Sequence, residues 1–212
     1  MKLYSYFRSS ASFRVRIALN LKGIPFEYAA VHLVKNEQLA PEFKALNPEA
    51  LVPVLADDDW SVTQSLAICE YLDETVPEPP LLPLDPVARS QVRALALLIA
   101  CEIHPLNNLR VLRYLVHELG ISEESKDGWY RHWVESGLAS LEAQLVHHAL
   151  PGPFCYGVRP TLADVCLVPQ VFNAQRFKCN LGGLSRVMTA YEACMELEPF
   201  QKAAPACQPD AA

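Results

Sequence analysis

The length, composition and charge of this chain exclude several classes of protein. Its 212 residues suit one large domain or two small ones, and 51% hydrophobic with 20% charged residues provide a packed core and exclude extensive disorder. Lys and Arg total 18 against 24 Asp and Glu, and the resulting net charge of −6 argues against sequence-independent binding of nucleic acid.

Membrane, export and metal signals are weak in the sequence. The longest uncharged apolar run, residues 94–101, is too short to span a membrane, and the N-terminal segment lacks the apolar core of a signal peptide. Seven cysteines include no CxxC pair for zinc binding or redox exchange. We therefore expect a cytoplasmic protein with reduced thiols, no membrane association and no metal site.

The first part of the chain predicts alternating strands and helices in the order βαβαββα. Residues 2–6 alternate like a strand, and apolar residues at helical spacing follow up to Gly23, with Ser10 and Ser12 as candidate N-caps. Further strands are expected at residues 26–33, 52–55 and 61–64, and further helices at residues 41–46 and from Ser65 onward.

A proline-rich segment divides the chain, because residues 77–86 hold five prolines in ten positions and can continue neither a helix nor a central strand. Only helices are expected after it, starting with an N-cap at Asp85. They are expected at residues 87–102, 106–119 and 129–147, from a capping box at Thr161 and Asp164, and at residues 186–196. We predict domains at residues 1–82 and 83–212, with a loose tail after Pro205.

Several motifs together resemble one known family. Val52-Pro53 follows an Asn-Pro turn, Gln64-Ser65 opens a helix, and residues 6–19 read YFRSSASFRVRIAL. Residues 103–109 (IHPLNNL), 161–164 (TLAD) and 168–177 (VPQVFNAQRF) agree with them in order along essentially the whole chain. The chain resembles the zeta class of glutathione transferases, the maleylacetoacetate and maleylpyruvate isomerases. The resemblance implies an α/β, thioredoxin-like, glutathione-binding N-terminal domain and an all-α C-terminal domain that carries the substrate pocket.

The resemblance implies that glutathione is the cofactor, and the residues suit its peptide character. Val52 before Pro53 can offer its backbone N–H and C=O to the cysteinyl unit, and a cis bond before Pro53 would aim them. Ser65 at a helix N-terminus can hold the γ-glutamyl carboxylate, with Gln64 as a neighbouring polar contact. A plain N-cap remains the alternative for Ser65, and both roles are compatible.

The thiol of glutathione must be a thiolate to react, and a serine hydroxyl with helix N–H groups can stabilise it. By resemblance Ser9 is the first candidate for this contact and Ser10 the second, although one of them could merely cap the helix. Ala11 stands where zeta-class members often carry cysteine, so mixed-disulfide chemistry is not expected there.

The family's remaining cofactor positions carry over residue by residue. They add to the glutathione contacts Ala11, Ser12, Phe13, Arg14, Gln38, His104, Asn108, Leu109 and Arg110. Among them, Gln38, His104, Asn108 and Leu109 imply contacts to the glycine end of glutathione, although His104 could be only structural. The positions from His104 to Arg110 also imply a homodimer. Leu51 replaces a polar residue of many relatives, so one contact to the glycine carboxylate is expected to be missing.

Arginines are the expected substrate anchors, because the implied substrates are cis-enediones that end in carboxylates. Arg8, Arg110 and Arg176 are the candidates, since a guanidinium grips a carboxylate bidentately. A lone arginine is usually a surface charge, which is the alternative for each of them. Arg14 and Arg16 either form salt bridges on the helix surface or support the site.

We therefore predict a glutathione-dependent cis–trans isomerase of maleylacetoacetate or maleylpyruvate, acting in the degradation of aromatic compounds or tyrosine. Thiolate addition would turn the cis double bond into a rotatable enolate, and Ser9, Ser10, Arg8 and Arg176 would be catalytic. The sequence does not separate the two substrates. Alternatives are a general transferase that conjugates electrophiles or dehalogenates small halo acids, and a non-catalytic scaffold with the same fold.

Overall fold

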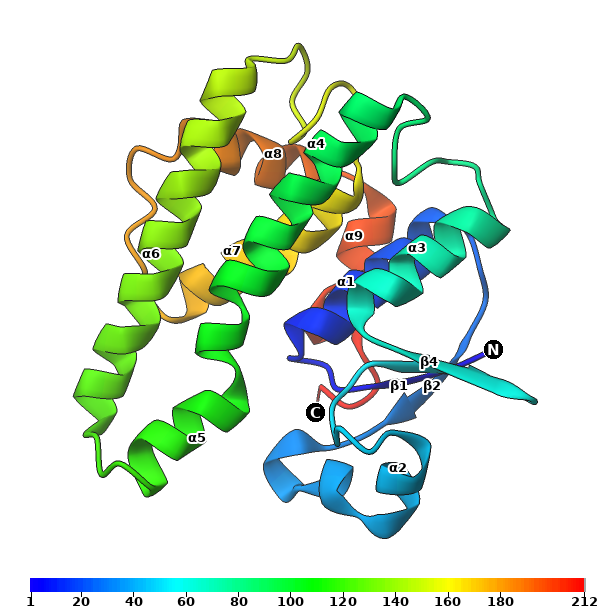
Figure 1. The fold of residues 1–212 in the computed structure, drawn as a ribbon, viewed down its shortest axis with the longest axis vertical. Helices are drawn as coiled ribbons and strands as arrows, with labels where there is room; N and C mark the ends of the chain where they lie inside the picture. The colour runs from blue at the N-terminus through cyan, green and yellow to red at the C-terminus, as the bar shows by residue number, and fades with distance from the viewer. Residues whose placement is uncertain (212) are drawn as a thin grey trace. The chain divides into compact units, whose positions relative to one another are not determined.

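The computed structural model describes residues 1–211, which form two compact units (Figure 1). The first unit contains Met1–Leu81 together with the segment from Met195 onward, and the second contains Leu82–Cys194. The sequence places residues 83–212 in a single helical domain, whereas in the structure the segment from Met195 onward packs with the first unit. Its Phe200 is wholly buried, and the Ala203 carbonyl accepts a 3.0 Å hydrogen bond from Nε of Arg16.

A four-stranded mixed sheet forms the centre of the first unit. Its strands are β1 (Lys2–Ser5), β2 (Glu27–Ala30), β3 (Val54–Asp57) and β4 (Trp60–Thr63), in the spatial order β2-β1-β3-β4. β1 is parallel to β2 and antiparallel to β3, and β3 is antiparallel to β4. The predicted order βαβαββα and the α/β class of this unit are confirmed, although every strand is shifted or shorter than expected.

Helices cover both faces of this sheet. They are α1 (Ser10–Leu21), α2 (Pro41–Leu46), α3 (Ser65–Thr75) and, from the C-terminal segment, α9 (Glu198–Ala203). Side chains alternate along a strand, so Leu3 lies on the face that α1 and α3 cover, while Tyr4 lies on the α2 face (Figure 1). On that second face the ring of Tyr4 contacts the ring of Phe43 edge-on, with centroids 6.1 Å apart.

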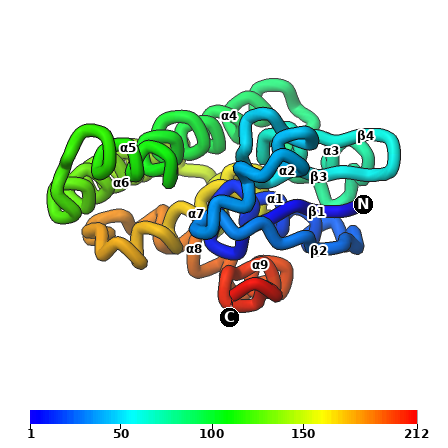
Figure 2. Tube along the Cα trace, turned by 90° about the horizontal axis from the view of Figure 1, so that it is seen from below, coloured from blue at the N-terminus to red at the C-terminus, as the bar shows by residue number. Residues whose placement is uncertain are grey.

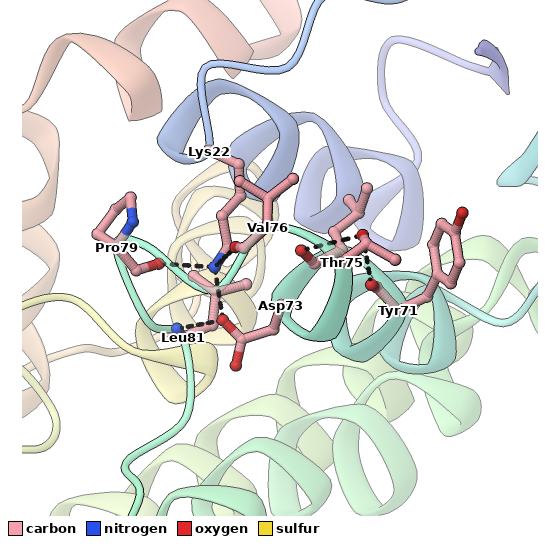
Figure 3. Close-up of polar contacts among 8 residues, drawn as sticks. Lys22, Tyr71, Asp73, Thr75, Val76, Pro79 and Leu81 are labelled. Carbon is pink, nitrogen blue, oxygen red and sulfur yellow. Dashed lines mark hydrogen bonds and ion pairs between the residues drawn. The ribbon is translucent and has the colours of Figure 1, made fainter.

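A buried ion pair fixes the chain after α3 (Figure 3). Lys22 Nζ donates to Asp73 Oδ1 at 2.6 Å and to the carbonyls of Val76 and Pro79, each at 2.7 Å. Asp73 Oδ1 also accepts from the Leu81 N–H at 2.7 Å. All three ammonium protons of Lys22 therefore have acceptors, which offsets the cost of burying the charge at the end of α1.

The second unit is helical. Its elements are α4 (Pro86–Leu97), a π-helical segment (Leu98–Ile103), a short 3₁₀ turn (Pro105–Asn107), α5 (Leu109–His117), α6 (Glu123–His148), α7 (Leu162–Arg176) and α8 (Ser185–Met195). The prediction of one regular helix over 87–102 is wrong, because α4 gives way to the wider π-helical turns before Pro105. Helix α6 begins six residues earlier than predicted, at an N-cap where Ser122 Oγ accepts the Ser125 N–H at 3.2 Å.

The capping box predicted before α7 is confirmed. Asp164 is fully buried, and its Oδ2 accepts the Thr161 N–H at 2.8 Å and the Thr161 hydroxyl at 2.9 Å. Its Oδ1 accepts the Cys155 N–H at 2.8 Å, which ties the preceding loop to the helix start. Every oxygen of this buried carboxylate therefore has a donor, as burial requires.

One segment, Pro86–His117, is long and apolar enough to cross a membrane when only length and a mean hydropathy of 1.2 are considered. Charged residues interrupt this segment, so it contains no uncharged apolar run longer than residues 94–101. Val92, Leu95, Ile99 and Ile103 are buried where α4 and the π-helical segment pack against α6 and α7. The same criterion is met by core helices of globular proteins, so it supports no membrane assignment.

Candidate active site

A tight turn carries the serines in the first unit. We call residues 6–9, between β1 and α1, the serine loop; its Ser9 N–H donates to the Tyr6 carbonyl at 2.9 Å. Ser9 is the N-cap of α1, because its Oγ accepts the Ser12 N–H at 3.2 Å. The expectation that Ser10 or Ser12 caps the helix is wrong: Ser10 is already the first helical residue, and Ser12 is fully buried.

Capping leaves Ser9 able to bind an anion. A serine hydroxyl has one donor and two acceptor sites, so the bond from Ser12 leaves its proton available. Ser9 is half-buried, whereas Ser10 is buried, and no acidic residue lies in the first turn of α1. The positive end of the helix dipole and the Ser9 hydroxyl thus favour a negatively charged group at this point.

The Val52–Pro53 pair immediately precedes β3, and the peptide bond between them is cis, as predicted. An Asn47 side chain holds the preceding turn by donating to the Leu51 carbonyl at 2.9 Å and accepting from the Glu49 N–H at 3.0 Å. Gln38, also in the first unit, is buried, and its Oε1 has no hydrogen-bond partner among the described residues. A buried amide of this kind suits a polar ligand.

The start of α3 forms a second anion-binding position. Gln64 has φ 68° and lies just outside the helix, and its Nε2 donates to Glu49 Oε2 at 2.9 Å. Ser65 is the first helical residue, so the alternative that its side chain is a plain N-cap is wrong. Its buried Oγ accepts from Nη1 of Arg14 at 3.3 Å. Helix N–H groups, a hydroxyl and a guanidinium therefore meet at one place, which fits a carboxylate.

Arg14 and Arg16 both lie inside the first unit, with exposed fractions of 2% and 0%. The alternative that they form salt bridges on the helix surface is therefore wrong. Arg16 donates to Ser5 Oγ at 3.1 Å and to the Phe7 carbonyl at 2.9 Å, so it lies directly beneath the serine loop. Burial lowers the pKa of Arg16 to about 10, and Tyr28 and Asp210 counteract that shift.

Arg8 is exposed at the rim of the serine loop. Its guanidinium lies 4.8 Å from the Phe7 ring centroid and donates from Nη2 to the Tyr6 hydroxyl at 3.0 Å. These two contacts restrict the side chain without consuming its remaining donors. A guanidinium with donors left over beside the start of α1 suits a carboxylate in charge and shape.

The second unit holds the other predicted site residues. His104 ends the π-helical segment, and Asn108 is the N-cap of α5 because its Oδ1 accepts the Arg110 N–H at 3.1 Å. Leu109 and Arg110 are exposed in the first turn of α5. Asn108 thus has a structural role that the motif alone did not reveal.

Arg176 is the last residue of α7 and is exposed. Its guanidinium lies 5.0 Å from the Phe177 ring centroid, and Nη1 donates to Asn173 Oδ1 at 3.4 Å. Phe177 in turn stacks on Tyr130 of α6, with centroids 3.6 Å apart. This aromatic pair supports the arginine at a fixed place on the surface of the second unit.

Three cysteine thiols of the second unit are poor candidates for nucleophiles. Burial raises the pKa of Cys155 and Cys194, and it raises that of Cys179 to about 11. These thiols therefore remain protonated near neutral pH. Position 11, at the start of α1, is an alanine and carries no thiol.

Comparison with known proteins agrees with this geometry. Residues 3–80 match the family model of the glutathione S-transferase N-terminal domain. A probable maleylacetoacetate isomerase of Vibrio cholerae is 51% identical over 99% of this chain and 97% of its own length. The chain therefore belongs to the glutathione S-transferase family.

Solved structures narrow the class within that family. A holo maleylpyruvate isomerase, described as a bacterial zeta-class glutathione S-transferase, is 48% identical with a TM-score of 0.98 over 100% of both chains. A maleylacetoacetate isomerase of Methylobacterium extorquens AM1, solved with bound malonate and glutathione, is 39% identical with a TM-score of 0.96 over 100% of both chains. The fold of this chain is thus that of the zeta class.

Proposed function

We propose that the protein is a glutathione-dependent cis–trans isomerase of maleylacetoacetate or maleylpyruvate. The observation that carries this proposal is the pair of anion-binding helix starts in the first unit, Ser9 at α1 and Ser65 with Arg14 at α3. The names of the relatives at about half identity support the reaction class. The acidic net charge of −6 leaves recognition of an anionic substrate to local arginines.

The residues of the first unit fit glutathione. When bound, glutathione supplies a thiolate that adds reversibly to a carbon–carbon double bond. Ser9 stabilises the negative charge of that sulfur, with Ser10 as the alternative, and the Val52 backbone aligns the cysteinyl unit. Ser65 and Arg14 hold the γ-glutamyl carboxylate, and the buried Gln38 amide contributes a further polar contact.

Arg8 and Arg176 bind the substrate carboxylates or the enolate oxygen, and Arg110 assists. Each guanidinium is exposed, and aromatic rings restrict Arg8 and Arg176. The relative from Methylobacterium extorquens AM1 was solved with malonate, a small dicarboxylate, beside glutathione. That ligand supports dicarboxylate or keto-acid substrates for this chain.

We further propose a cytoplasmic homodimer in which His104, Asn108 and Leu109 contribute to the glycine end of the cofactor site. Leu109 and Tyr114 are large apolar residues exposed on α5, which is the kind of surface that a partner subunit covers. All seven cysteines lack disulfide bonds in the structure, as is usual for a reducing compartment.

The purified protein tests this function directly. Both cis substrates are followed by absorbance with and without glutathione, alongside a small α-halo acid and an apolar electrophile. Isomerisation that requires glutathione, leaves its concentration unchanged and exceeds the other two activities supports the proposal. Faster conjugation of the apolar electrophile than isomerisation would assign the protein to the general transferases instead.

A further inference from the structure

The C-terminal segment, residues 198–210, is connected to the serine loop by hydrogen bonds. Asp210, near the end of the described chain, accepts the Phe7 N–H with Oδ2 at 3.1 Å. Its other oxygen, Oδ1, accepts the Tyr28 hydroxyl of β2 at 2.6 Å. One carboxylate thus joins the loop that carries Ser9 to the edge strand of the sheet, although Asp210 lies 203 positions after Phe7 in the sequence.

Arg16 makes a second connection between the same two parts of the chain. Its Nη2 and Nη1 donate to the carbonyls of Phe7 at 2.9 Å and Tyr6 at 3.4 Å. Its Nε donates to the Ala203 carbonyl, at the end of α9, at 3.0 Å. The backbone polar groups of the serine loop therefore point at two charged side chains of opposite sign.

The segment that carries Asp210 is ordered, so the expectation of a loose tail after Pro205 is wrong. Phe200, Ala203 and Pro205 are buried, and residues 205–207 form a 3₁₀ turn. Gln208 Nε2 donates to the Ala204 carbonyl at 2.9 Å and closes that turn. The hydrogen bonds of Asp210 and Arg16 therefore place this C-terminal segment, drawn red in Figures 1 and 2, next to the loop between β1 and α1.

We propose that residues 198–210 act as a positioning element for the thiolate site, with Asp210 and Arg16 as its positioning residues. They fix the Tyr6–Phe7–Arg8 backbone, and that backbone sets the direction of the Ser9 hydroxyl through the Ser9 N–H to Tyr6 carbonyl turn. This inference rests on the proposed function. Hydrogen bonds to a charged sulfur depend steeply on geometry, so a small displacement of the loop weakens catalysis while the remaining glutathione contacts are kept.

Three substitutions test the proposal. Asp210→Ala removes both acceptors, whereas Asp210→Asn keeps an acceptor for the Phe7 N–H and turns its amide donor toward the Tyr28 oxygen. Asp58→Ala is the matched control, because it removes the same charge at the exposed turn between β3 and β4. The kcat of each variant is calculated from the concentration of folded protein, so that loss of folded protein is not counted as loss of catalysis.

Amide hydrogen exchange without glutathione gives the first readout. Asp210→Ala is expected to speed exchange of the Phe7 and Ser9 amides, and Asp210→Asn and Asp58→Ala are expected to leave it close to wild type. The second readout is kinetic: Asp210→Ala should lower kcat roughly tenfold, less than the roughly hundredfold cost of a full 1 Å misplacement. It should also raise the apparent thiol pKa of bound glutathione and leave the KM for glutathione within about twofold.

Unchanged amide exchange in Asp210→Ala would overturn the coupling itself. Faster exchange with a wild-type kcat and thiol pKa would overturn its catalytic consequence. An Asp210→Asn variant as impaired as Asp210→Ala, in a folded protein, would also contradict the role of the acceptor oxygen. If even the wild type lacked isomerase activity, the proposed function would fail, while the exchange measurement would still decide whether the tail positions the loop.

Discussion

The buried guanidinium of Arg14 in α1 donates to the hydroxyl oxygen of Ser65, the first residue of α3, at 3.3 Å. The contact uses an acceptor site of Ser65, so the hydroxyl proton remains available for a ligand. It also places a positive charge beside helix N–H groups that have no intrahelical partners. Arg14 thereby links α1 to the start of α3, where we propose that the γ-glutamyl carboxylate of glutathione binds.

Replacing Ser65 tests the carboxylate position. Ser65→Ala should weaken the binding free energy of glutathione by about 1.5–3 kcal/mol, the range for a hydrogen bond to a charged group. The KM and Kd for glutathione should rise accordingly, and kcat should stay nearly unchanged. Ser61→Ala, at an exposed serine of β4, is the control and should bind normally. A kcat defect without a binding defect in Ser65→Ala would contradict this role.

Replacing Ser9 separates its two roles. Ser9→Ala should cost about 1 kcal/mol of unfolding free energy through loss of the N-cap, measured by denaturant titration. It should also lower kcat, by raising the activation free energy about 1.5–3 kcal/mol, because a hydrogen-bond donor to the sulfur is lost. For the same reason it should raise the thiol pKa of bound glutathione, which is read from thiolate absorbance.

Ser122→Ala is the matched control for Ser9→Ala, because Ser122 caps α6 with the same 3.2 Å bond. It should lose similar stability while its kinetics stay at wild-type values. If Ser10→Ala raised the thiol pKa and Ser9→Ala did not, the thiolate contact would belong to Ser10.

Local patterns predicted much of this fold. The strand and helix order, the linker prolines and the Thr161–Asp164 box follow from short-range rules, because each depends on neighbouring residues. The cis bond before Pro53 follows instead from the family resemblance. Tertiary contacts decided the rest. Nothing in the sequence around Arg16 shows that its partners include the distant Ala203 carbonyl, or that Asp210 reaches Phe7.

Helix boundaries failed for a similar reason. The π-helical turns before Pro105 bury Ile99 and Ile103 completely, and the apolar periodicity of the sequence does not distinguish such turns from an α-helix. The Ser122 cap, in contrast, had a visible signal: a serine followed by two glutamates in the first turn.

Two glycines of α6 give a paired stability test. A Cβ on Gly137 would overlap the side chain of Ile103, whereas a Cβ on Gly128 would meet nothing within 4 Å. Gly137→Ala should therefore destabilise the fold by about 1–3 kcal/mol, the usual cost of overpacking. Gly128→Ala should stabilise it by about 0.5–1 kcal/mol through helix propensity. Chemical denaturation measures both, and a stabilising Gly137→Ala would show that Ile103 moves aside without cost.

Subunit association is tested by sedimentation. The proposed homodimer should sediment at twice the 23.6 kDa chain mass at micromolar concentration. Leu109→Glu places a charge on exposed α5 and should weaken the dimer, whereas Val158→Glu, on an exposed loop, serves as the control. A fully active species that sediments only as a monomer would remove the proposal that a partner completes the site.

Replacing Arg8 and Arg176 tests whether these arginines bind an anionic substrate or are only exposed surface charges. Each guanidinium is exposed and rests against an aromatic ring, so its loss should not disturb the core. Arg176→Ala and Arg8→Ala should each lower kcat/KM, by a loss of transition-state stabilisation of about 1.5–3 kcal/mol, the range for a charged hydrogen bond. Lysine should rescue poorly, because an ammonium lacks the bidentate fork.

The kinetic pattern of these variants identifies what each arginine binds. A rise in KM alone indicates carboxylate binding in the ground state, whereas a fall in kcat indicates that the contact strengthens as the enolate charge develops. We expect the larger effect at Arg176, which lies within the segment 168–177 that carries part of the family resemblance. Arg159→Ala, at an exposed loop arginine, is the control and should behave as wild type. Wild-type kinetics in both Arg8→Ala and Arg176→Ala would leave the isomerase proposal without its substrate anchors.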